Sequence, residues 1–224
     1  MNRLHTGVAV LAAALLGNLA LPAQAAIIIS ETDPSASGNT PYAADWFELT
    51  NTGNVAVDIT GWRVDDNSNS FAVSRALLNV TSIAAHQTVV FIEATDLVAK
   101  SAAFINSWFA GVAPLGFAIG SYSGAGIGLS TNGDALNIFN GAGTLISRID
   151  FVASNTGFTF DNAAGVNNGL VTQLSVAGVN GAFVSVAGET GSPGSVSAVP
   201  VPAAAWLFGS ALAGMGALRR RRQG

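Results

Sequence analysis

Cysteine is absent from the 224-residue sequence, and histidine occurs only twice, as His5 and His86. Without cysteine the chain forms no disulfide, so its stability must come from a hydrophobic core. A zinc site needs three or four histidine, cysteine or carboxylate ligands. With no cysteine and only two histidines, such a site is not favoured. The composition therefore predicts a fold held by packing and argues against a zinc enzyme.

Basic residues are scarce outside the two ends of the chain. Arg3 and Arg219 to Arg222 are five of the nine lysine and arginine residues, whereas all 13 acidic residues lie between them. The intervening body therefore holds four basic residues against 13 acidic ones, a formal charge of −9. Nucleic acid requires a basic protein face, so this charge argues against a nucleic-acid partner. It is compatible with solubility and with divalent cations.

The first 25 residues show the charged, apolar and small-residue order of a secretory signal. Arg3 precedes an almost unbroken apolar run from Val8 to Leu21, and Ala23 and Ala25 occupy the two positions that a signal peptidase reads. This order predicts a signal peptide over residues 1–25, cleavage before Ala26 and export. The competing interpretation is a buried N-terminal helix.

The C-terminal segment, residues 197–224, combines a proline motif, an apolar run and a basic end. Val199-Pro200-Val201-Pro202 breaks any preceding structure, Ala203 to Leu218 carries no charge, and Arg219-Arg220-Arg221-Arg222 follows at once. Sixteen apolar residues give about 24 Å of helix, and local bilayer thinning and snorkelling arginines can make up the difference to a core of roughly 30 Å. The pattern predicts a transmembrane helix with the arginines on the cytoplasmic side and the body outside.

In this order, the three parts resemble the PEP-CTERM sorting tag. The usual tag motif reads Pro-Glu-Pro, and Val201 stands here in place of the glutamate. The resemblance implies recognition by an exosortase, a membrane transpeptidase-like enzyme of Gram-negative bacteria that make exopolysaccharide. It also implies an inner-membrane intermediate that is passed on to the cell surface or the extracellular matrix.

Between the two ends, short apolar stretches alternate with asparagine and glycine turns, which is typical of an all-β sandwich or barrel. About 170 residues can bury one sizeable core, so we expect one domain over residues 26–196. A helix is predicted from Asp96 to Phe109, with Thr95 or Asp96 as its cap. The Gly/Ser/Pro-rich residues Gly188 to Ser197 are predicted to form a spacer. The main predicted strands are Ile27 to Ser30, Asp45 to Thr50, Thr88 to Glu93, Ala135 to Phe139 and Leu145 to Val152.

Several blocks of the body, in order, resemble a lamin-tail domain. Ile27 to Glu31, Asp45 to Asn51 and Ile59 to Trp62 match its opening strands, while Leu129 to Phe139 and Gly191 to Gly194 match its later strand pair and closing Pro-Gly. The resemblance spans roughly residues 27–195 and implies an immunoglobulin-like β-sandwich with one short inserted helix. It further implies a binding or anchoring module on an exported protein.

One polar turn is a candidate metal site. Asp65, Asn67 and Asn69 lie at alternate positions with Asp66 among them, as ligands do in a calcium loop. An EF-hand would then need Gly and Glu where Ser70 and Ala76 stand, so the segment is not an EF-hand. Two interpretations stay open: an Asx-rich turn, or a weak calcium site of Asp65, Asp66, Asn67 and Asn69. No other cofactor is predicted.

No catalytic constellation stands out in the mature chain. His86 lies in a predicted turn, and Glu31, Glu48 and Glu93 show no spacing that marks a catalytic pair. Glu48 alternates with Phe47 and Leu49 and is expected on the outer face of its strand. These observations predict a non-enzymatic surface or matrix protein in an exopolysaccharide or biofilm layer. The alternative is a secreted carboxylate-dependent hydrolase that acts on polysaccharide or phosphoester.

Overall fold

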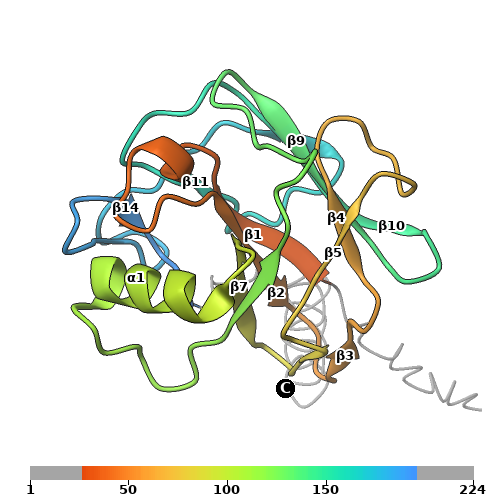
Figure 1. The fold of residues 1–224 in the computed structure, drawn as a ribbon, viewed down its shortest axis with the longest axis horizontal. Coiled ribbons are helices and arrows are strands. Elements are labelled where there is room, and N and C mark those ends of the chain that lie inside the picture. The colour runs from red at the N-terminus through yellow and green to blue at the C-terminus, as the bar shows by residue number, and fades with distance from the viewer. Residues whose placement is uncertain (1–26, 196–224) are drawn as a thin grey trace, which may run out of the picture.

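The computed structural model describes residues 27–195, whose fold is built on two five-stranded sheets (Figure 1). The predicted signal peptide, its cleavage site at Ala23, Ala25 and Ala26, and the predicted tag over 197–224 lie outside the described residues. Within 27–195, no helix is both long and apolar enough to cross a membrane.

The first sheet has the strand order β11-β1-β2-β7-β8. Its strands pair antiparallel except β7 and β8, which run parallel because α1 connects them. The strands are β1 (Ile27–Asp33), β2 (Trp46–Asn51), β7 (Thr88–Glu93), β8 (Ile119–Tyr122) and β11 (Phe160–Asp161).

The second sheet has the order β12-β10-β9-β4-β5, with a parallel pair between β10 and β12. Two short pairs, β3 with β6 and β13 with β14, and a 3-10 turn, η1 (Ala36–Gly38), complete the domain. The remaining strands are β3 (Val57–Asp58), β4 (Arg63–Asp65), β5 (Arg75–Ala76), β6 (Ser82–Ile83), β9 (Asp134–Phe139), β10 (Leu145–Phe151), β12 (Gly169–Val171), β13 (Phe183–Val184) and β14 (Thr190–Gly191).

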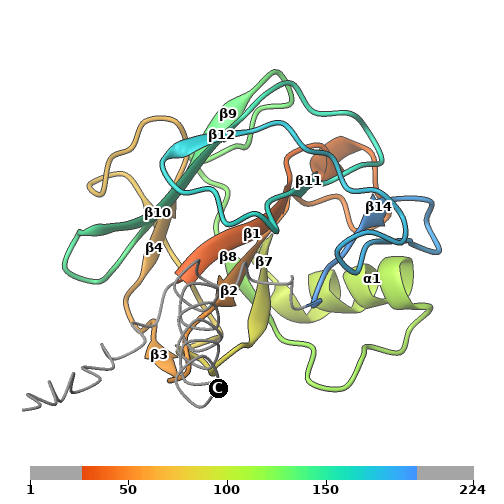
Figure 2. The same ribbon diagram turned by 180° about the vertical axis from the view of Figure 1, so that it is seen from behind.

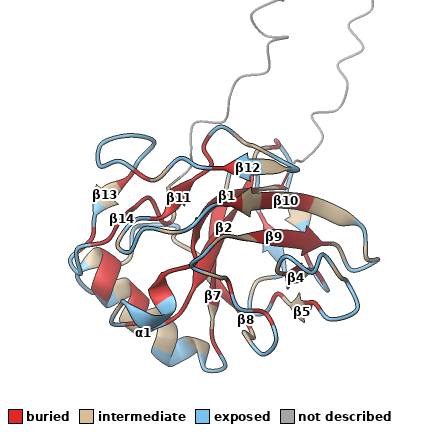
Figure 3. Cartoon of the chain, turned by 90° about the horizontal axis from the view of Figure 1, so that it is seen from above, coloured by how far each residue is buried: buried red, intermediate tan, exposed pale blue. Residues whose placement is uncertain are grey.

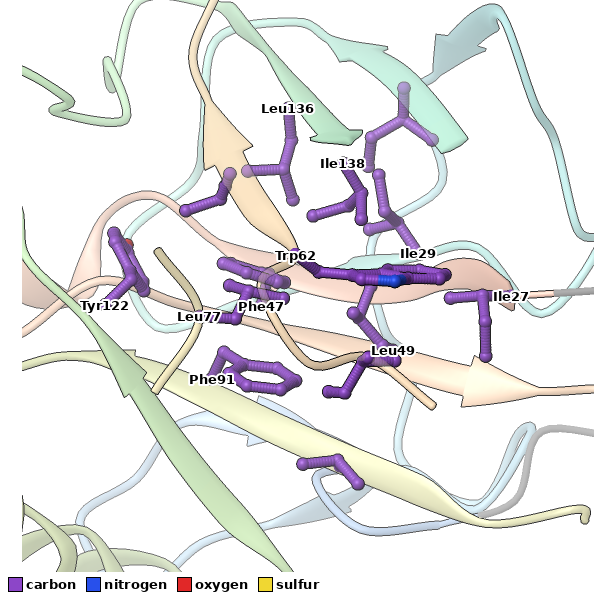
Figure 4. Packing of buried hydrophobic residues seen from close by; sticks show 14 of the residues in the cluster. Ile27, Ile29, Phe47, Leu49, Trp62, Leu77, Phe91, Tyr122, Leu136 and Ile138 are labelled. Carbon is purple, nitrogen blue, oxygen red and sulfur yellow. The ribbon is translucent and has the colours of Figure 1, made fainter. Parts of the chain in front are cut away.

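The main hydrophobic core lies between the two sheets. Phe47 and Leu49 alternate along β2 toward the second sheet, where Leu136 and Ile138 of β9 meet them (Figure 4). Trp62 packs into the same cluster. The period of two along each strand buries one face against the other, so the predicted mostly β fold, a sandwich, is confirmed.

The opposite face of the first sheet is buried as well. Trp46 and Ile92 point away from the main core and pack under α1 (Leu97–Phe109), beside its Phe104 and Trp108. Figure 2 shows α1 beside β7 of the first sheet. The Trp46 and Trp108 rings meet edge to face at 5.8 Å. β1 and β2 are therefore buried along nearly their whole length (Figure 3).

The inserted helix begins and ends as its sequence predicts. The Asp96 side chain accepts hydrogen bonds from the backbone N–H groups of Val98 and Ala99, so Asp96, not Thr95, is the cap. Ala110 closes the helix in the left-handed conformation, with φ of 53°. The buried aromatic side chains of α1, Phe104 and Trp108, lie on the face of the helix that packs on the first sheet.

The C-terminal end of the domain differs from the predicted spacer. Glu189, Thr190 and Ser192 are buried, and β14 pairs with β13. The spacer prediction over Gly188 to Ser197 is therefore wrong for this part. Small residues suit a spacer, but here they allow close packing against the first sheet.

Candidate functional site

The predicted calcium turn follows β4 and is held by its own side chains. The Asp65 Oδ2 atom accepts hydrogen bonds from the Ser68 hydroxyl at 2.7 Å and the Ser70 N–H at 2.6 Å. Asp66 Oδ1 accepts from the Ser68 N–H at 3.0 Å, which is the geometry of an Asx turn. Asn67 donates its N–H to Asp134.

Metal coordination at this turn stays a prediction. Asn69 has a positive φ of 48°, as expected for the tip of a turn. Across residues 27–195 no group of three or more histidine, aspartate or glutamate side chains is arranged to hold a metal ion. One observation favours a ligand: Asp65 Oδ1 is buried and accepts no hydrogen bond within the described chain.

His86 occupies an exposed turn with a positive φ of 57°. Its Nε2 atom lies 2.9 Å from Asn54 Oδ1, and no carboxylate or hydroxyl forms a hydrogen bond with this ring in the described structure. A histidine base needs a nucleophile on one side and an orienting group on the other. The turn supplies neither.

Buried carboxyl groups are the most unusual feature of the domain. Seven of the 13 acidic side chains are buried, although charged groups rarely are unless they are paired. The described residues contain one salt bridge, Arg148 to Asp150, and neither partner belongs to this set. Apart from Asp65, the buried acids lie on or next to the first sheet and β14: Glu31, Asp33, Asp45, Glu48, Asp161 and Glu189.

Glu31 and Glu48 are direct partners across β1 and β2. Glu31 accepts hydrogen bonds from the Thr159 hydroxyl at 2.5 Å and from both the N–H and the hydroxyl of Ser192, at 2.8 and 3.0 Å. Burial raises the pKa of Glu31 to about 7, although these hydrogen bonds oppose the shift. The Glu31 carboxyl thus joins β1 to the C-terminal end of the domain.

Glu48 lies on the face of β2 opposite Phe47 and Leu49, as expected, but this outer face is covered. Its carboxyl accepts hydrogen bonds from the Ser30 hydroxyl at 2.8 Å and from the Gly194 N–H at 2.6 Å. Burial, and then the charge of Glu31, hold the pKa of Glu48 well above its usual range. The expected outer face is therefore an inner surface beneath residues 192–194.

Asp33 and Glu189 form a second carboxyl pair, hydrogen-bonded to each other. The Tyr42 hydroxyl donates to Glu189 Oε1 at 2.6 Å, and Ser35 donates its N–H and hydroxyl to Asp33 Oδ1. Glu189 Oε2 is buried without a donor, which a shared proton between the two acids explains. Burial raises the pKa of Glu189 to about 7 and also raises that of Asp33.

A third pair, Asp45 and Glu93, lies where β2 and β7 meet the loops at one end of the sheet. The Glu93 N–H donates to the Asp45 carbonyl oxygen at 2.9 Å, and Asp45 Oδ1 accepts from the Ser37 N–H. Burial raises the pKa of Asp45 to about 7, with the charges of Asp33 and Glu93 adding to the shift. The pair is the one candidate here for acid chemistry near solvent.

Glu93 is half-buried and lines a cleft of about 210 Å³ together with Lys100, Thr95 and Ser123. Burial raises the pKa of Glu93, and the charge of Lys100 opposes the shift. A Cβ atom at Gly124 would lie 1.7 Å from Glu93 Oε1, so only glycine lets this loop approach the carboxyl. A hydrolase could use the half-buried Glu93 carboxyl in this cleft.

The structure thus pairs two of the glutamates that the sequence left unpaired, Glu31 with Glu48, and sets Glu93 beside Asp45. Sequence reasoning missed Glu189 and Tyr42, which lie 147 positions apart in the chain. The only local signal was the closing motif that ends at Gly194.

Comparison with known protein families identifies a match. A family model described as Lamin Tail Domain matches residues 21–153, more than half of the chain. The match spans the strands from β1 to β10 and includes α1. No curated protein matches the chain.

The calcium hypothesis predicts that millimolar calcium raises the melting temperature, because the ion would bind the folded chain alone. The increase should be at most a few degrees, since extracellular sites bind at roughly 10⁻⁴ to 10⁻³ M. The Asp65→Asn/Asp66→Asn variant keeps an acceptor oxygen at each position and should lose the increment. Magnesium is the control ion, and a melting curve insensitive to calcium would leave the Asx turn alone.

Stability should fall as the pH rises toward neutrality. The pKa values of Glu31, Asp45 and Glu189 are about 7 in the folded chain and roughly 4 in the unfolded chain, so between these values the folded chain binds more protons. Their contribution is fully present below about pH 4 and is lost as the pH rises through about 7. Calorimetry should give a melting temperature several degrees higher at about pH 5 than at about pH 8.

Asp45→Asn provides the variant for that measurement. It keeps the oxygen that Ser37 needs but no longer titrates, so it should raise the melting temperature at about pH 8 and reduce the difference between the two pH values. Asp58→Asn is the control, because hydrogen bonds from Thr60 lower the pKa of this exposed acid. A wild-type melting temperature that rises from pH 5 to pH 8 would contradict the prediction.

Proposed function

The chain belongs to the lamin tail domain family, and from this we propose that it is a non-catalytic module displayed on the cell surface or in the extracellular matrix of a Gram-negative bacterium. The observation that carries the proposal is the attachment of Ser192 and Gly194 to the buried carboxyls of β1 and β2. The chain therefore leaves the domain at a fixed place. The predicted sorting segment, residues 197–224, begins two positions after Ser195, and its Val-Pro-Val-Pro motif begins at Val199.

The two ends of the sequence predict how the chain would be exported and brought to the cell surface. A signal peptidase would release residues 1–25 at Ala26, and the segment with Val199-Pro200-Val201-Pro202 and Arg219-Arg220-Arg221-Arg222 would hold the chain in the inner membrane. An exosortase would then act on this PEP-CTERM-like segment. The displayed domain would act in an exopolysaccharide or biofilm layer, and its charge of −9 disfavours nucleic acid as a partner.

The state of the acidic side chains supports a module without catalysis. Six buried carboxyls lie on the first sheet or beside it, and Glu31, Glu48, Asp33 and Glu189 hydrogen-bond with groups of the fold itself. A catalytic acid must reach its substrate. These four carboxyls instead connect the beginning of the domain to its end.

Replacing Arg219 to Arg222 with glutamine should leave export intact, because the signal peptide is unchanged, but should block removal of the tail. Mass spectrometry and fractionation of producing cells should find unprocessed chain in the membrane. Lysine at the same four positions keeps the charge and separates membrane orientation from recognition of arginine itself. Normal processing of the glutamine variant would contradict the sorting proposal.

The hydrolase alternative rests on Asp45 and Glu93 beside the cleft of about 210 Å³. We expect zymograms of the purified chain on polysaccharide and phosphoester substrates to be blank. Hydrolysis that falls by about 10²-fold or more in Glu93→Gln, and not in Asp58→Asn, would replace the module function with an enzymatic one.

A further inference from the structure

The last described residues, 189–195, form a strap that crosses the α1 side of the first sheet; we call them the C-terminal strap. Figure 2 places β14, which belongs to the strap, between α1 and β11. The backbone of Thr190 bonds to Gly157 and Thr159, at 2.8 and 3.1 Å, and so attaches the strap to the segment before β11. The Thr88 hydroxyl of β7 also donates to the Ser195 carbonyl oxygen at 3.4 Å, whereas the attachments of the strap to β1 and β2 involve carboxyl groups.

Three carboxyl contacts hold the C-terminal strap from β1 and β2. Asp33 is hydrogen-bonded to Glu189, Glu31 accepts two hydrogen bonds from Ser192, and Glu48 accepts one from the Gly194 N–H. The fit is close: a Cβ atom at Gly191 would lie 2.7 Å from Glu31 Oε1 and 2.8 Å from Trp108 Cη2. The strap therefore lies directly on the carboxyls, with no layer of water between.

The charges that face the strap are all of one sign. Asp161 lies close enough to Glu31 and Glu48 to raise the pKa of both, and Asp45 lies near Asp33. Lys100, a basic side chain of α1, donates to the carbonyl oxygens of Tyr42 and Ala43 at 2.6 and 2.7 Å. The described structure thus provides no cation to neutralise these acids, so the closed strap depends on protons.

We propose that the C-terminal strap is a pH-sensitive latch. It is closed while the Asp33–Glu189 pair and the Glu31–Glu48 pair each hold a proton, and it opens when both pairs are fully ionised. Two ionised carboxyl groups side by side in a dry interior repel strongly, whereas opening lets water solvate them. This inference uses only contacts within residues 27–195, so it does not depend on the proposed sorting route.

Opening would change two properties of the domain at once. It would uncover part of the aromatic surface under the strap, including the edge of the Trp108 ring that lies against Gly191. It would also lengthen the connection between the sandwich and whatever follows Ser195. The domain would hold its own C-terminal connection tightly in an acidic layer and loosely in an alkaline one.

Hydrogen exchange followed by mass spectrometry tests the latch on the full chain. After correction for the intrinsic effect of pH, the amides of residues 189–195 should lose at least about tenfold in protection between pH 5.5 and 8.5. Peptides from β9 and β10 should keep theirs, because no carboxyl pair holds these strands. Equal protection of the strap at both pH values, or equal loss in β9 and β10, would overturn the proposal.

Two glutamine variants separate the latch from general pH sensitivity. Glu189→Gln mimics the protonated acid, because its amide can donate to Asp33 while its oxygen accepts from Tyr42. Glu48→Gln removes the charge beside Glu31 and keeps an acceptor for Gly194. Each should keep the strap more protected at pH 8.5 than the wild type, and the exposed Asp58→Asn control should behave as the wild type. Variants with the wild-type pH dependence would show that these pairs do not operate a latch.

Discussion

Burial of the first sheet on both of its faces is the constraint on which the rest of the structure depends. One face packs on the second sheet through Phe47 and Leu49, and the other lies under α1 and the C-terminal strap. A strand buried on both sides leaves no solvent-exposed place for its polar side chains, so Glu31 and Glu48 must find partners inside the protein. The strap supplies those partners, and for this reason the end of the domain is attached to its beginning.

The same constraint determines the chemistry of the acids. A carboxyl in a dry interior is stabilised by donors, by a cation or by a proton. The described acids of this sheet have donors from Thr159, Ser192 and Gly194 but no cationic partner, so they retain protons toward neutral pH. The acidic character of the body is therefore partly hidden, because its formal charge of −9 counts groups that are not fully ionised in the folded chain.

In the displayed module that we propose, the contacts that stabilise the fold also fix the place where the chain leaves the domain. The strap that completes the buried surface is also the last part of the domain before the predicted sorting segment. An attachment built from hydrogen bonds to carboxyls is strong when dry and protonated and weak when hydrated and charged. The cleft at Glu93 lies at the loop end of β7, where a solvent-borne ligand could meet Glu93 and Lys100.

Local patterns alone predicted the main strands and the helix: β2 follows from alternation around Phe47 and Leu49, and α1 from a capping residue, Thr95 or Asp96, before an apolar stripe. These patterns are readable because each depends on neighbours in sequence. The sequence also determined the acidic balance and the resemblance to the family whose model matches residues 21–153, and it predicted the two terminal signals.

Only the tertiary structure decided the rest. Glu48 is on the outer face of its strand, yet buried, because residues more than 140 positions away cover it, and no local pattern encodes which distant segment will do so. Pairing of Asp33 with Glu189, and the proton this requires, arises from the close approach of the two ends of the domain.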